Sequence, residues 1–540
     1  MTPRASSTFA ADAAAVDAHA STGRAAALLA VLAVAVYGVA IAGFSRTGLP
    51  QTMAPGGHWP YLADKPLGED GFYMLKVGWN LAAGRGLSYN GTTPTTGIQP
   101  LATFLYAAIA WVVRACGGET WAFLRAVVAI SAIGFAAFAL QMGRLAARLA
   151  PETARGRAAA LATVLVACDF VLFRLFTYGL ETGLYLALLA ACVLASLDLR
   201  PGRPGARELW VGVLAGLTFW ARIDYGVLFA IVLLAMLLER RIRLPQAAAI
   251  GAAAFVVGVP WLLWVHHVTG GWLPSSGGAQ MKLLAAGDWK YRVWIMAHVL
   301  VDHAVAWMHT GSWALLMTAV ASLAALAAWT LLPGGRGSPA RRALADAAAR
   351  LRPWMIATAL LAGVYLVLFW AAHFYARYTS PLLVAWVPLV AVALATRVDG
   401  RGVAVASALL LACFAAQAAG ELHDGRLDSS HTVTAGYIRA HYPTVKVGAY
   451  QSGIAGFFNP NVVNLDGKVE GAALAALKAN RTAIWADSTG IAVVTDWPSY
   501  LSGFMASGAA PGAWVPCPVD VPNGMTRCLL RRGGPADVAR

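Results

Sequence analysis

The sequence predicts an α-helical polytopic membrane protein with about eleven transmembrane helices and a small C-terminal α/β domain. Three observations support this prediction. The 540 residues are 59% hydrophobic and only 12% charged, whereas soluble proteins average about 25% charged residues. Apolar runs close to the roughly 20 residues that cross a bilayer recur along most of the chain. Residues 421–540 instead alternate short strands with helical stretches.

The transmembrane helices are expected at eleven apolar stretches. The first, from about Ala25 to Phe44, is too long for a signal-peptide core and lacks a cleavage site, so it should be retained after a cytoplasmic segment, 1–24. The others are expected near 121–142, 158–174, 180–198, 209–221, 225–238, 246–266, 312–332, 354–372, 380–396 and 402–420. The transmembrane domain would then cover 25–420, including a long first loop, 45–120, and the α/β domain would cover 421–540.

Arginine-rich loops predict the orientation. Basic clusters at 144–157, 200–207, 240–243, 336–352 and 397–401 should all face the cytoplasm. They can share one side only if two ambiguous apolar stretches, 98–115 and 288–308, do not both cross, so we expect these stretches to lie at the interface or re-enter. The sequence therefore predicts a bacterial inner-membrane protein with its N-terminus inside and its first loop and C-terminal domain outside. These loops also account for the net charge of +15, and no nucleic-acid-binding motif accompanies it.

The first loop contains two adjacent acids, Glu69 and Asp70, followed by an aromatic helical stretch and several glycines. A loop this long is usually functional or disordered, and its aromatic residues argue against disorder. Two neighbouring carboxylates near an apolar interface resist ionising together. The pair therefore suits a general base or a ligand for a divalent cation. The alternative is a charge pair favoured by the dipole of the following helix.

Polar residues interrupt the apolar pattern near the ends of other predicted helices. Glu181 lies at the rim of a span, where a carboxylate is costly and often functional, although it could also face water. Arg222 and Asp224 lie between two short apolar helices, where the pair could brace the corner or the arginine could bind phosphate.

Two further basic positions are expected outside the cytoplasm. Lys282 follows a turn rich in serine and glycine that could bind phosphate. Arg377, next to Tyr378, opposes the positive-inside trend, which an anionic ligand or an interfacial anchor would explain. No metal site is predicted, because the adjacent histidines at 266 and 267 would point in different directions on a helix.

The C-terminal segment predicts a short parallel sheet. Strands are expected at 445–450, 462–465 and 491–495, with helices near 434–443 and 471–479. The N-L-D-G sequence at 464–467 is typical of a structural turn. Cys517 and Cys528 flank a stretch rich in proline, asparagine and glycine, which predicts a hairpin disulfide in an oxidising compartment.

The first loop resembles that of bacterial polytopic glycosyltransferases of the GT-C superfamily, which use polyprenyl-phosphate-linked sugars. The resemblance rests on E-D-G-F-Y-M-L-K-V-G-W-N-L-A-A-G-R-G from Glu69, followed by T-T-G-I-Q-P-L. Further pieces follow in the family's order over about residues 60–470: G-L-E-T at 179–182, A-R-I-D at 221–224, L-P-S-S-G at 273–277, A-R-Y-x-x-P at 376–381 and N-L-D-G at 464–467. The chain departs from the usual motif at Glu69, Thr96 and Ala102, where Asp, Asn and Trp are common. Arabinofuranosyl- and mannosyltransferases look similar here, so the sugar is not fixed.

The resemblance implies inverting transfer of a sugar from a polyprenyl-phosphate donor to a cell-envelope glycan, lipid or protein acceptor outside the cytoplasm. Glu69 aligns with the first acid of the family's pair and is the expected base, with Asp70 as its partner or as a cation ligand. Arg222, Lys282 and Arg377 are expected to bind the phosphate, and Asn80 and Gln99 to contact the sugar or brace the loop. The expected substrate-binding set also includes Glu181, Asp224 and Tyr378.

Two alternatives to an enzyme remain. One is a transporter or flippase of a lipid-linked saccharide, which would favour charges within spans and helices broken at mid-membrane. The other is an inactive scaffold of an envelope polysaccharide assembly. ATP-driven transport is unsupported, because the sequence has no phosphate-binding P-loop.

Overall fold

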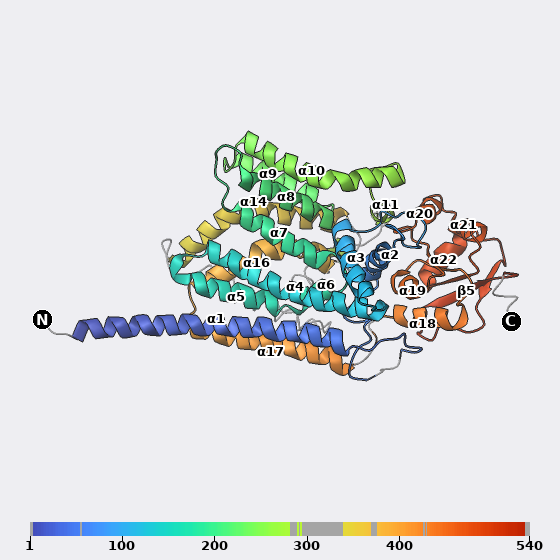
Figure 1. The fold of residues 1–540 in the computed structure, drawn as a ribbon, viewed down its shortest axis with the longest axis horizontal. Helices are drawn as coiled ribbons and strands as arrows, with labels where there is room; N and C mark the ends of the chain where they lie inside the picture. The colour runs from blue at the N-terminus through green and yellow to red at the C-terminus, as the bar shows by residue number, and fades with distance from the viewer. Residues whose placement is uncertain are drawn as a thin grey trace.

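The fold is a long helical bundle with a small domain at one end (Figure 1). The computed structural model describes residues 4–53, 57–280, 289–290, 292–293, 339–368, 375–424, 427 and 429–534. The N-terminus lies at the end of the bundle opposite the C-terminal domain. The bundle and the domain thus define the two ends of the molecule.

The bundle consists of helices at the positions where the sequence predicts spans. Among the described residues, four helices are long and apolar enough to cross a membrane: α1 (Arg4–Phe44, in its part Thr22–Phe44), α4 (Thr120–Leu149), α10 (Leu244–Thr269) and α17 (Gly400–Asp424). Others complete the bundle: α7 (Thr182–Ser196), α8 (Ala206–Ala221), α9 (Tyr225–Leu238), α14 (Pro339–Leu368) and α16 (Pro381–Ala395). A count of eleven spans is not confirmed, and the predicted span at 312–332 lies outside the described residues.

The predicted span at 158–174 is not one continuous helix. The chain forms two helices there, α5 (Arg155–Ala167) and α6 (Phe170–Thr177), bent by 62° with respect to each other. Asp169 lies at the break, and its carboxylate accepts a hydrogen bond from the Leu172 amide at 3.0 Å. This is the N-cap role for which aspartate is favoured, so the acid within the apolar run marks the start of a new helix.

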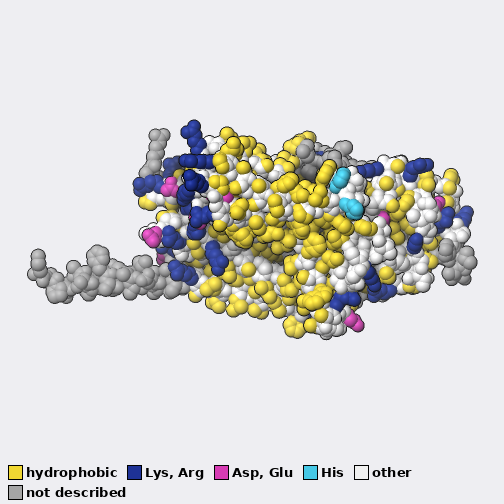
Figure 2. All heavy atoms as spheres, turned by 45° about the horizontal axis from the view of Figure 1, so that its top comes forward, with side chains coloured by type: hydrophobic (Ala, Val, Ile, Leu, Met, Phe, Trp, Pro, Cys, Tyr) yellow, Lys and Arg dark blue, Asp and Glu magenta, His cyan; other side chains and the backbone are white. Residues whose placement is uncertain are grey.

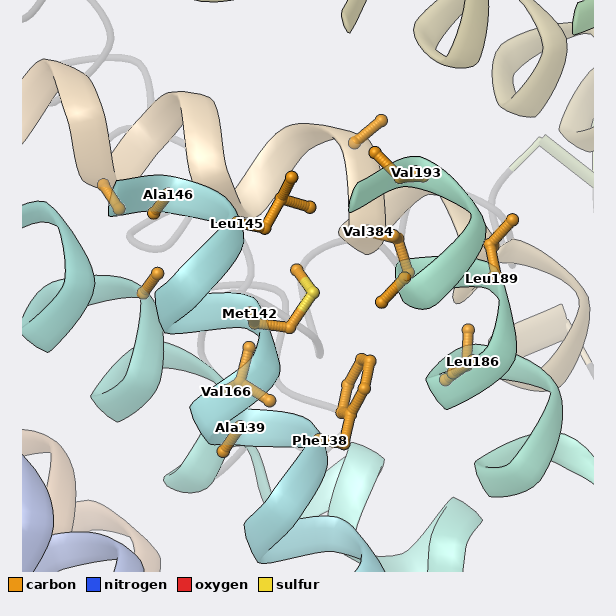
Figure 3. Close-up of a cluster of buried hydrophobic side chains, with 14 of the residues drawn as sticks. Phe138, Ala139, Met142, Leu145, Ala146, Val166, Leu186, Leu189, Val193 and Val384 are labelled. Atoms are coloured by element: carbon orange, nitrogen blue, oxygen red, sulfur yellow. The ribbon is translucent and has the colours of Figure 1, made fainter. Parts of the chain in front are cut away.

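Part of the core of the bundle lies between α4, α5, α7 and α16 (Figure 3). Figure 3 shows Met142 and Phe138 of α4 directed between Leu186 of α7 and Val384 of α16. The phenylalanine and the methionine are at most 1% exposed. Alanines at neighbouring positions of α4 leave room for the adjacent helices to approach, as is usual where helices pack within a membrane.

Short helices lie between the bundle and the C-terminal domain. They are α2 (Gly71–Ala82), α3 (Pro100–Ala115), α11 (Ser275–Gln280) and α15 (Tyr375–Thr379), while the 3-10 turn η1 (Glu152–Ala154) lies before α5. Figure 1 shows α2 and α3 together at the end of the bundle that meets the domain. This position is compatible with the interfacial role expected for 98–115. Nearly all of the second ambiguous stretch, 288–308, lies outside the described residues.

The C-terminal domain is a five-stranded mixed sheet in the order β2-β1-β3-β5-β4. Its elements are α18 (His431–His441), β1 (Val447–Ala449), α19 (Gly453–Phe458), β2 (Val462–Asn464), α20 (Gly471–Lys478), α21 (Thr482–Ser488), β3 (Val493–Asp496), α22 (Pro498–Ala506), β4 (Trp514–Pro516) and β5 (Arg527–Arg531). The first three strands are parallel, with Val447 opposite both Val462 and Val493.

Two strands of this sheet were not predicted. β5 runs antiparallel to β3 and β4 antiparallel to β5, so the sheet is mixed rather than parallel. A disulfide joins Cys517 and Cys528 beside this hairpin, which confirms the pairing expected from the sequence. The signal for the hairpin was the turn-rich stretch between the cysteines.

Basic side chains gather at the end of the bundle away from the C-terminal domain (Figure 2). Contacts between loops explain this grouping, because Arg350 donates to the Arg148 carbonyl at 2.5 Å and Arg241 donates to the Arg350 carbonyl at 2.7 Å. Three of the loops predicted to be cytoplasmic therefore meet at one end, as the positive-inside rule requires of loops on the same side.

Candidate active site

Glu69 lies just before α2 and contacts the C-terminal domain. Its carboxylate accepts hydrogen bonds from the Gly453 amide and, at 2.8 Å, from the Ile454 amide, the first two amides of α19. Burial raises the pKa of Glu69 to about 7; the two amide hydrogen bonds oppose the rise, and the neighbouring carboxylate of Asp70 adds to it. Both oxygens of Glu69 are thus used to hold the domain against the first loop.

The same face of α2 makes two further contacts with the C-terminal domain. The Tyr73 hydroxyl donates to the Tyr450 carbonyl at 3.3 Å and accepts from the Ser452 amide at 3.1 Å. One turn further, Lys76 donates to the Gly456 carbonyl, near the end of α19. Burial lowers the pKa of Lys76 to about 7. Sequence reasoning missed this face, although the spacing of residues 69, 73 and 76 places them on one side of a helix.

Asp70 points to a different group of partners. Its carboxylate lies 3.6 Å from Nζ of Lys468 and 4.0 Å from the Arg377 guanidinium. The side chains of Asp70, Arg377 and Lys468 remain 19%, 14% and 26% exposed, respectively. We call these three residues the junction cluster. Because each side chain is partly open, a ligand could reach all three.

Lys468 is the member of this cluster that the sequence did not single out. Burial alone would lower the pKa of Lys468, but the carboxylates of Asp466 and Asp70 outweigh burial and hold the pKa above its ordinary value. The Asp466 carboxylate is 3.1 Å from Nζ. The lysine directly follows the N-L-D-G turn, in which Gly467 adopts a positive φ of 76° and its amide donates to the Asn464 side chain at 3.0 Å. The turn has the predicted structural role, and it also presents the lysine.

Three of the sequence pieces behind the family resemblance meet at the Lys468 backbone. The Ser275 hydroxyl donates to the Lys468 carbonyl at 2.7 Å, and the Ser275 amide donates to the Thr96 hydroxyl at 3.1 Å. A Cβ at Gly97 would collide with the same carbonyl. The T-T-G piece therefore needs its glycine for a close approach of two chain segments.

A second group of charges lies in the adjoining end of the bundle, with Glu181 and Arg222 buried and Asp224 partly exposed. Arg222 donates to both oxygens of Asp224, at 3.0 and 2.6 Å, to Glu181 at 3.1 Å and to the Tyr365 hydroxyl at 3.0 Å. Glu181 is fully buried and also accepts two hydrogen bonds from Arg377, at 2.8 and 3.1 Å. We call Glu181, Arg222 and Asp224 the bundle cluster. The geometry favours the alternative in which the arginine and Asp224 brace the corner.

Tyr378 and Arg377 connect the two clusters. The Tyr378 ring stacks on Tyr365 at 4.5 Å between centroids, and the guanidiniums of Arg222 and Arg377 lie 5.1 and 5.8 Å from it. Arg377 contacts Glu181 on one side and Asp70 on the other. Arg222 and Arg377 are the described residues expected to bind phosphate, and of these two Arg377 reaches the junction cluster.

The remaining predicted site residues have other positions. The side-chain amide of Asn80 donates to the carbonyls of Ser88 and Tyr89, each at 3.0 Å, so it braces the loop. Gln99 directly precedes α3 and is half-buried. Lys282 lies outside the described residues. Within the part of the chain that the structure describes, no three His, Cys, Asp or Glu side chains are grouped to hold a metal ion.

A cavity of about 1140 Å³ lies beside the segment that carries Lys468. Thr96 and Ser275, which fix that segment, form part of its wall. Two tryptophans, Trp264 and Trp272, line it together with charged residues of the domain such as Glu470. Its walls come from the first loop, the end of α10 and α20, so it lies at the same junction.

Comparison with solved structures shows the fold. The crystal structure of ArnT from Cupriavidus metallidurans bound to undecaprenyl phosphate is 13% identical to this chain, covers 93% of it and 97% of ArnT, and has a TM-score of 0.53. The apo form of ArnT has a TM-score of 0.47 at 14% identity and the same coverage. The apo oligosaccharyltransferase of Archaeoglobus fulgidus matches 91% of this chain and 73% of its own length, at 13% identity and a TM-score of 0.48.

The match to ArnT bound to undecaprenyl phosphate confirms the predicted fold in outline, without the count of eleven spans. This chain has the fold of that ArnT structure, a bundle of apolar helices followed by a small sheet at the C-terminus. No protein-family model and no curated protein sequence matches the chain.

Proposed function

We propose that this protein is a membrane glycosyltransferase that transfers a sugar from a polyprenyl-phosphate donor to a cell-envelope glycan, lipid or protein acceptor. The observation that carries the proposal is the junction cluster, in which one carboxylate and two cations remain partly open to a ligand. Two points support it. The cluster lies on a fold shared with ArnT, and the ArnT structure with that fold is bound to undecaprenyl phosphate.

In this proposal the protein lies in the bacterial inner membrane, with the junction cluster outside the cytoplasm. The grouping of basic loops at the far end of the bundle supports this orientation, since such loops face the cytoplasm. The Cys517–Cys528 disulfide in the C-terminal domain agrees with it, because disulfides persist in oxidising compartments.

In this proposal Asp70, rather than Glu69, is the base. Glu69 uses both of its oxygens on the amides of α19, whereas the Asp70 carboxylate faces two exchangeable cations. Asp70 would take the proton from the acceptor hydroxyl as its oxygen attacks the anomeric carbon of the sugar. The bond from that carbon to the phosphate oxygen breaks from the opposite side, so the configuration inverts and polyprenyl phosphate leaves with the electron pair.

Arg377 and Lys468 would bind the departing phosphate. Charge that develops on a leaving oxygen is stabilised most effectively by cations already fixed in a poorly hydrated site. Before the donor binds, these two cations are paired with Asp70. A bound phosphate would compete with Asp70 for both cations and leave the carboxylate free to accept a proton, which couples donor binding to activation of the base.

The other site residues have structural roles in this proposal. Glu69 positions the C-terminal domain and thereby Lys468. Glu181, Arg222 and Asp224 hold Arg377 and Tyr378 in place from inside the bundle. Asn80 and Gln99 belong to the loop that supports the cluster. Gln99 could also contact the sugar directly, because its side-chain oxygen is buried without a hydrogen-bond partner among the described residues.

A direct test incubates the purified full-length protein with a panel of polyprenyl-phosphate sugars and an extract of cell-envelope acceptors, and follows consumption of each donor. Wild type should consume at least one donor, and Asp70→Asn should slow this by about 10²–10⁴-fold, the usual contribution of a general base. Asp520→Asn is the matched control, because this exposed acid lies in a loop of the C-terminal domain.

Three outcomes would contradict the proposal. Equal rates for wild type and Asp70→Asn would remove Asp70 as the base. Binding of a donor without consumption would favour an inactive scaffold. Movement of an intact lipid-linked sugar across a vesicle membrane, without transfer, would favour a flippase.

A further inference from the structure

A large cleft lies on the side of the bundle, lined by residues of α4, α5, α7 and α8, and it shares no residue with the junction cluster. Its volume is about 1180 Å³, above the roughly 300–1,000 Å³ typical of small-molecule pockets. Most of its lining side chains are small or apolar: Gly134, Ala137, Ala187, Ala191, Leu194 and Leu214. A Cβ at Gly134 would meet no atom within 4 Å, so this wall faces open space.

The walls of the cleft offer little to a polar ligand. The one amide side chain among its lining residues, Gln141, already donates to the Ala187 carbonyl at 3.1 Å. The surrounding surface is also apolar, since Trp210, at the edge of the cleft, is 55% exposed and Ile133 is 57% exposed. Whatever occupies the cleft must therefore be apolar along most of its length.

One end of the cleft is strongly basic. Arg144, Arg148 and Arg155 all line it and are exposed, and none of the described residues lining it is acidic. Arg148 is paired with Asp198, and Arg155 only loosely with Glu152 at 3.8 Å, where both side chains are largely exposed. A net positive charge therefore remains at this end, where Figure 2 shows basic side chains gathered.

We propose that this cleft binds an anionic phospholipid, with its acyl chains against α4, α7 and α8 and its phosphate at Arg144 and Arg155. The apolar wall and the basic end match the two parts of such a lipid. Arginine suits the phosphate because its planar fork donates two parallel hydrogen bonds. Basic pockets between membrane helices on the cytoplasmic side are a known form of acidic-lipid recognition.

The lipid site is separate from the proposed donor site in position and chemistry. Arg144 lies in the C-terminal part of α4 and Arg155 at the start of α5, at the basic end of the bundle, whereas Asp70 contacts the C-terminal domain. By the positive-inside rule the lipid would come from the cytoplasmic leaflet. The proposal therefore does not depend on the reaction at the junction cluster.

Trp210 provides a direct readout, because it lines the cleft. Full-length protein in detergent would be titrated with phosphatidylglycerol or phosphatidylcholine carrying brominated chains, which quench nearby tryptophans. The Trp210 signal is the difference between wild type and Trp210→Phe. We expect saturable quenching of Trp210 at lower concentrations of phosphatidylglycerol than of phosphatidylcholine.

Two kinds of variant sharpen the test. Replacing Arg144 and Arg155 together with glutamine should raise the apparent Kd for phosphatidylglycerol at least about tenfold, while the exposed Arg203→Gln at the same end should leave it unchanged. Ala191→Phe should fill the cleft and abolish the saturable signal. Equal quenching by both lipids, or an unchanged Kd in the arginine double variant, would overturn the proposal. Because that double variant changes only exposed side chains, the test does not depend on how Ala191→Phe folds.

Discussion

Arg377 links the bundle cluster to the junction cluster, and the two clusters differ in how closely their charges are paired. In the bundle cluster Glu181 is fully buried and Arg222 donates to two carboxylates and a tyrosine. In the junction cluster Asp70 faces Arg377 and Lys468 at 4.0 and 3.6 Å, and all three side chains are partly exposed. Closely paired charges can hold a structure, whereas loosely paired, accessible charges can exchange partners with a ligand.

This difference separates residues that stabilise the structure from residues that can take part in the reaction, although the two kinds of position look alike in the sequence. Glu181 and Asp70 are both acids next to helix starts outside the basic end. Their roles diverge because the bundle cluster is closed by Tyr365 and Tyr378, whereas the junction cluster forms only where the first loop meets the C-terminal domain.

The largest expected effect is on stability, in the bundle cluster. Glu181→Gln leaves Arg222 and Arg377 with weakened partners in a buried site, and breaking a buried ion pair costs roughly 3–5 kcal/mol. Thermal unfolding in detergent should therefore occur at a clearly lower temperature. Asp198→Asn is the control, because it removes an ion pair at the surface of the other end and should change stability little. Equal shifts in both variants would show that the bundle cluster is not a brace.

A somewhat smaller effect, on donor binding, is expected at Lys468. Lys468→Met keeps an unbranched side chain but removes the cation, so the apparent KM for the donor should rise about a hundredfold through loss of a charge-assisted contact with phosphate. Lys446→Met, at an exposed lysine of the same domain that does not line the cavity at the junction, should leave the KM unchanged. A lower kcat with an unaltered KM would show that Lys468 does not bind the ground-state phosphate.

Gly97 should have a smaller effect on the same site. In Gly97→Ala the new Cβ would collide with the Lys468 carbonyl, so the segment carrying this lysine must move. Misplacement of a binding group by about 1 Å can cost up to 10²-fold in rate, and we expect roughly a tenfold loss of transfer. Gly503→Ala, in α22, is the control because its Cβ would meet no atom within 4 Å. Full activity of Gly97→Ala would indicate that the position of Lys468 is not critical.

An effect of a different kind, on the pH dependence of stability, is expected through Glu69. Burial raises its pKa to about 7 in the folded protein, from an ordinary value of 4.5. The folded chain therefore keeps a proton that the unfolded chain releases, so the contribution of Glu69 to stability is full below pH 4.5 and is lost as the pH rises through 7.

Glutamine at position 69 cannot titrate. The stability of Glu69→Gln should therefore decline less steeply as the pH rises through this range. The unfolding temperature, measured between pH 5 and 7.5, should fall less steeply with pH in Glu69→Gln than in wild type or in Asp520→Asn. Parallel curves for all three proteins would show that the Glu69 carboxyl keeps its ordinary pKa.

Much of this architecture could be predicted because membrane helices and parallel strands leave strong local patterns. Apolar length located the helices, and the polar residues at their ends marked Glu181, Arg222 and Arg377. The break at Asp169 was missed because one acid changes the average hydrophobicity of a span very little, although it caps a new helix. Strands β4 and β5 were missed because they are short and follow turn-rich sequence.

The site was only partly predictable, because its members depend on contacts between distant segments. Asp70 and Lys468 are almost 400 positions apart, and nothing near the lysine indicates that its amine meets a carboxylate of the first loop. Neighbouring residues in the sequence likewise do not decide whether Glu69 or Asp70 is the base. The choice depends on the amides of Gly453 and Ile454, which hold Glu69 and leave Asp70 facing the cations.

The central claim is that the open carboxylate, Asp70, performs the chemistry and that Glu69 positions the domain. Single-turnover transfer at saturating donor, measured for Asp70→Asn and Glu69→Gln in matched amounts of folded protein, tests this most directly. The account predicts that Asp70→Asn slows the chemical step by at least about 10²-fold, while Glu69→Gln retains a rate within about tenfold of wild type. A chemical step that is lost in Glu69→Gln and preserved in Asp70→Asn would contradict the account.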